Sequence, residues 1–167
     1  MALTSYQFRN QPYWLGFTFA GQAFTVSYRS TIEPGNSLYI QISTGKDTIA
    51  HITNRTITSQ VEQLGIKLIE SPWFIAGRKK IPAINLDGRS KIQAATSFYS
   101  DATDICGGTI LEESMIPRVA FYGGSPIEST LYERILQYDT NYILEITNEG
   151  FCPNSTVLNM AFYESGN

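Results

Sequence analysis

The chain has 167 residues, of which only 16% are charged, while 43% are hydrophobic and 13% aromatic. Its net charge of −3 argues against nucleic acid as a partner, because binding to phosphates needs clustered lysine and arginine. The length fits a single domain with its own core, and an exterior so poor in charge suits packing against other protein.

The first 22 residues are rich in aromatic side chains and precede the first regular alternating segment. This segment is either a first core strand or an extended arm that lies across a neighbouring chain, and the two alternatives stay open. Aromatic residues are favoured at protein interfaces. The candidate interface residues are Tyr6, Phe8, Tyr13 and Trp14. The start lacks a basic, apolar leader and no window is apolar enough to span a membrane, so we expect no membrane association.

From residue 23 to residue 71 the chain reads as strands separated by turns. Alternation predicts strands over 23–32 and 38–43, and an imperfect or bulged strand over 48–61. A further strand ends before Pro72, because proline cannot continue a ladder. Residues 71–90 contain two prolines and two glycines and are predicted to be a long connection. Its basic run, 78–80, reads as a solvated loop.

The second half continues the pattern. We predict a strand over 91–100, a turn over 101–109, and a short strand or helical turn over 110–117. Residues 130–138 have helix-like spacing but are interpreted as extended. Residues 140–148 and 156–164 are expected to pair as a closing hairpin. Short strands with turns about every ten residues predict an all-β, single-domain β-sandwich of jelly-roll type over 23–167.

Reactive side chains are few, so we expect no enzyme, no cofactor and no metal. The single histidine, His51, lies in a predicted strand with no carboxylate at metal-ligand spacing. Glu112 and Glu113 are the best candidates for a glycosidase pair, but neighbours on a strand point to opposite faces, so we interpret both as exposed charges. Cys106 and Cys152 are expected to be buried and unbonded.

Several short motifs in the C-terminal third occur in an order that resembles a group of tailed-bacteriophage virion proteins. The motifs are Gly108-Thr109, Glu133-Arg134 with Leu136, Asp139-Thr140-Asn141-Tyr142, Ile146-Thr147-Asn148 and Phe162-Tyr163-Glu164. A weaker likeness runs through 23–45. Glu145 stands where that group commonly has a basic residue, and Phe162 replaces its usual tryptophan.

The resemblance implies a non-enzymatic jelly-roll protein on the outer surface of a phage particle, made in the bacterial host cytoplasm. The expected function is a capsid decoration or cement protein that forms a homo-oligomer, by preference a trimer, and binds the major capsid protein. The alternatives are a tail or head-fibre component, either an adaptor or a receptor-facing tip, and, outside this class, a carbohydrate-binding β-sandwich.

Overall fold

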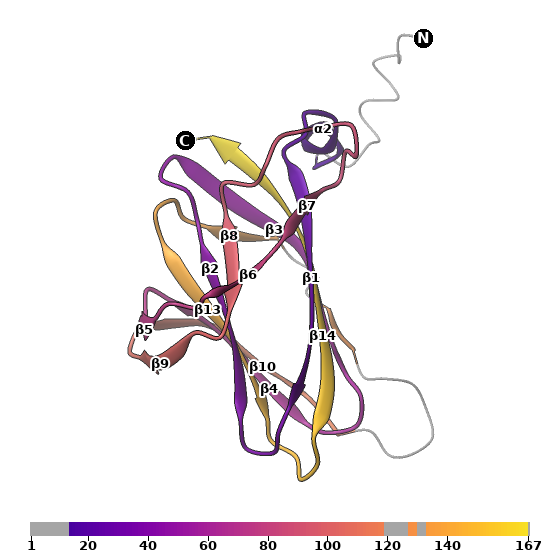
Figure 1. Ribbon diagram of the computed structural model, residues 1–167, viewed down its shortest axis with the longest axis vertical. Coiled ribbons are helices and arrows are strands. Elements are labelled where there is room, and N and C mark those ends of the chain that lie inside the picture. The colour runs from indigo at the N-terminus through magenta and orange to yellow at the C-terminus, as the bar shows by residue number, and fades with distance from the viewer. Residues whose placement is uncertain (1–13, 119–126, 130–132, 167) are drawn as a thin grey trace.

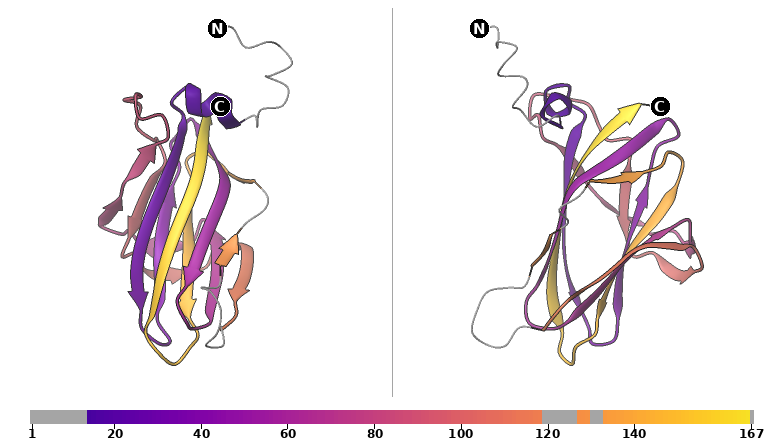
Figure 2. Two further views of the ribbon diagram at one scale, coloured as in Figure 1. Left: turned by 90° about the vertical axis from the view of Figure 1, so that its right-hand side faces the viewer. Right: turned by 180° about the vertical axis from the view of Figure 1, so that it is seen from behind.

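The computed structural model describes residues 14–118, 127–129 and 133–166 (Figure 1). In these residues two antiparallel sheets pack face to face, with a small two-stranded sheet beside them and one short helix. Figure 2 shows the two layers edge-on and from behind. The predicted all-β sandwich is therefore confirmed.

The first sheet has the order β11-β3-β14-β1-β7, and β12 also pairs with β3. Its long central strand, β14, is paired on one side with β1 and on the other with β3. The strands are β1 (Ala23–Ile32), β3 (Thr48–Ser59), β7 (Ala83–Asn85), β11 (Ile127–Ser129), β12 (Arg134–Leu136) and β14 (Asn154–Gly166).

The second sheet has the order β10-β4-β13-β2-β8-β6. Its central strand β13 pairs with β2 on one side and β4 on the other. The strands are β2 (Ser37–Ser43), β4 (Leu64–Glu70), β6 (Lys79–Ile81), β8 (Ser97–Ser100), β10 (Thr109–Ile116) and β13 (Asn141–Asn148).

The main strands pair in a nested order that defines a jelly roll. β1 pairs with β14, β2 with β13, β3 with β11 and β12, and β4 with β10. The strands β1 to β4 therefore alternate between the two sheets, and so do β13 and β14. The predicted closing hairpin is wrong for this reason: β13 and β14 are joined by a short loop but lie in different sheets.

The connection from β4 to β10, residues 71–108, is more ordered than predicted. β6 and β8 extend the second sheet beyond β2, and β7 extends the first sheet beyond β1. Two further strands, β5 (Trp73–Ile75) and β9 (Thr103–Cys106), pair as a separate ribbon, where a connection and a turn were expected. The predicted strand over 91–100 is restricted to β8. The choice at 110–117 is decided in favour of a strand, β10.

Alternation places the core between the sheets. In β1 the side chains of Phe24 and Val26 are buried, and in β13 those of Tyr142, Leu144 and Ile146, as predicted. The register of β3 against β14 shifts between Ala161 and Phe162. The irregularity expected in β3 is therefore a β-bulge. The principal core residues are Phe24, Val26, Ile40, Ile42, Ile52, Ile57, Leu64, Ile66, Leu68, Phe98, Leu136, Tyr142, Leu144, Ile146, Leu158, Met160 and Phe162.

Ile143 is also buried, although alternation assigns it to the outer face of the second sheet. Its partner in β2 is Gln41, whose side-chain oxygen accepts a hydrogen bond from the Gly77 backbone N–H at 3.0 Å. The segment after β5 therefore covers this part of the outer face, which explains why both faces of β13 are apolar here.

The predicted N-terminal arm or first strand is wrong for residues 14–19, which form helix α2 (Trp14–Phe19). The helix ends in a Schellman motif, in which the Gln22 N–H bonds to the Phe17 carbonyl at 2.8 Å and the Gly21 N–H to the Thr18 carbonyl at 3.0 Å. Gly21 has a φ of 71°, which glycine adopts at low cost. The chain thus turns sharply from α2 into β1.

Candidate functional site

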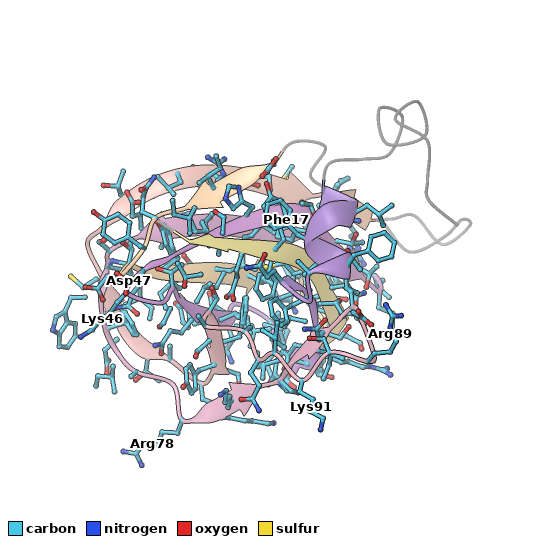
Figure 3. All side chains as sticks on the ribbon, turned by 90° about the horizontal axis from the view of Figure 1, so that it is seen from above. Phe17, Lys46, Asp47, Arg78, Arg89 and Lys91 are labelled. Atoms are coloured by element: carbon cyan, nitrogen blue, oxygen red, sulfur yellow. The ribbon has the colours of Figure 1, made fainter. Side chains whose placement is uncertain are left out.

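The outer face of the first sheet carries a stack of three rings drawn from distant parts of the chain. Phe17 of α2 lies 4.1 Å from Tyr163 of β14, with an angle of 20° between the ring planes. Tyr163 in turn lies 4.4 Å from the ring of His51 on β3, at 9°. His51 and Tyr163 are direct cross-strand partners, so the sheet register itself places them side by side. Figure 3 shows Phe17 where α2 meets the sheet.

Polar groups lock the stack in place. Glu133 accepts hydrogen bonds from the Tyr163 hydroxyl at 2.6 Å and from His51 Nδ1 at 2.7 Å. Since Nδ1 donates, Nε2 of the neutral ring accepts a hydrogen bond from the Ser165 hydroxyl at 2.9 Å. Tyr163 is only 4% exposed. Every polar atom of the stack named here therefore has a partner.

The same contacts set the protonation of the two rings. Burial lowers the pKa of His51 below its usual 6.5, because the charged ring loses hydration. Burial, followed by the hydrogen bond to Glu133, raises the pKa of Tyr163. Both rings are therefore neutral near pH 7, and a neutral histidine matches the hydrogen-bond pattern described above.

A carboxylate, an imidazole and a hydroxyl in line are the groups of a serine nucleophile site. Two features separate the Glu133–His51–Ser165 row from such a site. Ser165 lies within the paired strand β14 instead of on an exposed turn. A hollow of about 330 Å3 on this face is lined by Thr53, Ala161 and other residues up to Tyr163, but not by His51 or Ser165. The row is better placed to anchor α2 than to cleave bonds.

The predicted interface residues are only partly described. Tyr6, Phe8 and Tyr13 lie outside the described residues, and Trp14 is the first residue of α2. The sequence did not indicate that Phe17 would meet Tyr163 and His51. The sequence showed only that the segments forming α2 and β14 are both rich in aromatic residues.

Glu112 and Glu113 point to opposite faces of β10, as predicted, but only one is an exposed charge. Glu113 pairs with Lys67 at 3.4 Å and has a side chain that is 64% exposed. Glu112 is turned inward, bonded to the buried Arg55 of β3, with Arg134 at 3.5 Å. It joins the two sheets, and the prediction that it is a solubilising charge is wrong.

The two cysteines correct a further prediction. Cys106 and Cys152 are both free, as expected, but both are exposed and not buried. Cys106 lies on the outer ribbon opposite Trp73, and Cys152 lies in the loop between β13 and β14. Neither position belongs to the sandwich core, because the chain leaves the two sheets at both points.

The ribbon formed by β5 and β9 is a second surface that the sequence did not single out. Trp73 is 65% exposed and Ile75 is 49% exposed, at the two ends of the three-residue strand β5. Tryptophan at an exposed position is typical of binding hot spots. The only sequence signal was a tryptophan between two prolines in a segment interpreted as a connection.

No three His, Cys, Asp or Glu side chains in the described ranges come together in a way that could hold a metal ion. Nor does the described part of the chain contain a helix long and apolar enough to cross a membrane.

No protein-family model matches this sequence, and no curated protein sequence matches it.

Proposed function

We propose that this chain is a non-enzymatic structural protein of a tailed-bacteriophage particle, most simply a decoration protein on the outer surface of the capsid. It would be made in the bacterial host cytoplasm and would bind the major capsid protein through its aromatic N-terminal segment, residues 1–13. The resemblance in residues 23–164 supports the class of protein. The anchoring of helix α2 supports the mechanism.

The observation that carries this mechanism is the stack of Phe17 on Tyr163. A stacked aromatic pair contributes about 0.5–1.5 kcal/mol beyond the burial of its surface. Together with the Schellman motif at Gly21, it fixes the direction in which α2 leaves the sandwich. A binding segment held at a fixed point loses less entropy on docking than one on a loose linker.

The anchor also connects α2 to the central strand of the first sheet. Tyr163 belongs to β14, which is paired along its length with both β1 and β3. A force on residues 1–13 would pass through Phe17 into this central strand, and from there into the whole first sheet. Such an attachment suits a protein that holds neighbouring capsid subunits together against internal pressure.

The test is co-sedimentation with capsids that lack this protein, purified from the phage that encodes it. A variant without residues 1–13 should not sediment with the shells, although its far-UV circular dichroism and thermal unfolding match the full chain. A length-matched control replaces Tyr6, Phe8 and Tyr13 with serine and should fail in the same way. Binding at full strength by both variants would refute the docking function of this segment.

Copy number distinguishes a capsid protein from a tail or head-fibre component. Quantitative mass spectrometry of purified virions should find hundreds of copies for a decoration protein, because it follows the capsid lattice. A handful of copies per particle would place the chain in a tail or fibre instead.

A further inference from the structure

A hollow opens at the edge of the sandwich, where the chain crosses from the second sheet to the first. β6 pairs with β8 as far as Ile81 and Phe98, and after Pro82 the chain continues as β7, which pairs with β1. Figure 1 shows this crossing from β8 toward β7. The crossing chain and the segment 93–97 enclose a hollow of about 420 Å3, called the edge hollow below. Sites for small ligands have volumes of about 300–1,000 Å3.

The edge hollow has an apolar wall and a polar rim. Ile81 belongs to the core between the sheets, and Ala83 and Ala94 pack against that core. None of the described residues that line the hollow is acidic, and Lys80 forms no ion pair with any residue that the structure describes. The hollow therefore carries one positive charge. Its polar lining residues are Lys80 and Gln93, which are exposed, the half-buried Ser97 and the buried Thr96.

A buried hydroxyl group without a partner marks the interior of the edge hollow. Thr96 lines the hollow and is 2% exposed, and its Oγ1 has no hydrogen-bond partner within the described ranges. An unpaired buried hydroxyl costs free energy, and a polar molecule bound beside it removes that cost. The hydroxyl and the methyl group of threonine exchange places by one rotation about χ1, so the hydroxyl can face a ligand from this position.

The backbone of β7 adds a donor and an acceptor. The Leu86 N–H bonds to the carbonyl of its partner Ala23 at 2.9 Å, so two residues earlier Ile84 also exchanges hydrogen bonds with β1. In an antiparallel pair the residues between point the other way. The N–H and C=O of Ala83 are therefore directed away from β1, at the edge of the sheet where the hollow lies.

These groups define the chemistry of the ligand. Lys80 favours a carboxylate at the rim, and the hydroxyl, amide and backbone groups pair with hydroxyls of the ligand. A second anionic group beside Thr96 is disfavoured, because the buried Glu164 carboxylate lies there. Its two oxygens accept hydrogen bonds from the N–H groups of Ala95 and Thr96 at 3.0 and 2.7 Å. A molecule with one carboxylate, several hydroxyls and C–H groups for the apolar wall is an acidic sugar.

We propose that the edge hollow binds a single acidic sugar of the uronic-acid type, with its carboxylate at Lys80 and a hydroxyl at Thr96. The site includes no residue of α2 or of residues 1–13, so it is separate from the proposed attachment to a capsid. It also lies at the opposite edge of the second sheet from Glu112 and Glu113 of β10. With no acidic residue in its lining, the site binds the sugar without hydrolysing it.

NMR titration of the full chain with glucuronate tests this site. At ordinary ligand efficiency a molecule of about 13 non-hydrogen atoms binds with a Kd of about 1 mM, so amide signals of residues 93–97 should shift and approach saturation by about 20 mM. Glucose has the ring but no carboxylate, and cyclohexanecarboxylate has the carboxylate but no hydroxyls. Each should bind at least about fivefold more weakly than glucuronate.

Two substitutions separate the two principal contacts. Thr96→Val keeps the shape and removes the hydroxyl, so glucuronate binding should weaken about fivefold, while the Tm of the free protein stays the same or rises because no hydrogen bond is lost. Lys80→Gln should also weaken binding about fivefold and should abolish the loss of affinity on adding salt. Lys67→Gln, which removes a lysine from β4, is the matched control and should bind glucuronate like the unmodified protein.

Shifts that do not saturate, or equal affinity for glucuronate and glucose, would overturn the proposal. A lower Tm for Thr96→Val with unchanged binding would do so too, since it would show that the hydroxyl is satisfied within the protein. Deletion of residues 1–13 should leave glucuronate binding intact, and its loss would place the ligand outside the edge hollow. Loss of capsid binding with glucuronate binding retained, or the reverse, would therefore tell the two proposals apart.

Discussion

Replacing Glu112 with glutamine removes one charge from the ionic contact that joins the two sheets. Arg55, on β3 of the first sheet, has a side chain that is 4% exposed, and Glu112, on β10 of the second sheet, has one that is 10% exposed. Glutamine has nearly the same shape, so the packing is kept. The buried guanidinium of Arg55 then loses the charge of the Glu112 carboxylate.

The expected cost follows from burial. Removing one partner of a buried ion pair costs about 3–5 kcal/mol. The second cation, Arg134, is 29% exposed, so water reaches this side of the contact and the lower end of that range applies, about 3 kcal/mol. With about 2.1 cal/mol/K of unfolding entropy per residue, 167 residues give about 0.35 kcal/mol/K, and the Tm should fall by about 9 °C.

The matched control is the neighbouring residue on the same strand. Glu113→Gln removes the same charge from the outer face, where the pair with Lys67 is exposed and contributes at most about 1 kcal/mol. Urea and thermal unfolding of both variants are compared at a protein concentration where light scattering shows monomers. Equal destabilisation by the two substitutions would refute the reasoning, because the structure assigns the cost to burial and not to charge.

Three further outcomes are expected. Phe17→Ala should lower the free energy of unfolding by about 1 kcal/mol through loss of the ring stack with Tyr163, and should speed amide exchange in α2; unchanged exchange there would contradict the anchor. The lowered pKa of His51 means that the unfolded chain binds its proton more readily, so stability should fall as the pH drops below 6.5, by at most about 1.4 kcal/mol per pH unit. Between pH 7.5 and 5.5 the free energy of unfolding should depend less steeply on pH for His51→Gln than for the unmodified protein. The same pH dependence in both proteins would contradict the lowered pKa of His51. Cys106 and Cys152 should both react with a thiol reagent without denaturant, and fewer than two thiols titrated would contradict their exposure.

Local pattern predicted most of the long strands but not their partners. The alternation in 23–32 and 140–148 matches β1 and β13, and the irregularity at 48–61 is the bulge in β3. The expected hairpin between β13 and β14 failed. Sequence proximity and a short loop favour a hairpin, whereas the nested closure of the jelly roll sends the two strands to different sheets. The short strands in 71–108 were missed because proline and glycine interrupt their alternation.

The candidate site depended still more on tertiary structure. Phe17, His51 and Tyr163 come from α2, β3 and β14, Glu133 directly precedes β12, and no spacing along the chain links the four. The burial of Glu112 was missed for a similar reason. A glutamate on a strand looks exposed until an arginine from the opposite sheet is placed against it.

The sequence by itself determined the class of fold: its period-two pattern, frequent turns and low charge allow a sandwich with a polar, uncharged exterior and little else. Only the tertiary structure decided which strands meet, where the two sheets are joined by charge, and how α2 is fixed to the outer face. The reason is physical. A strand's alternation depends on its immediate neighbours, but its partner is chosen by the closure of the whole chain around one core.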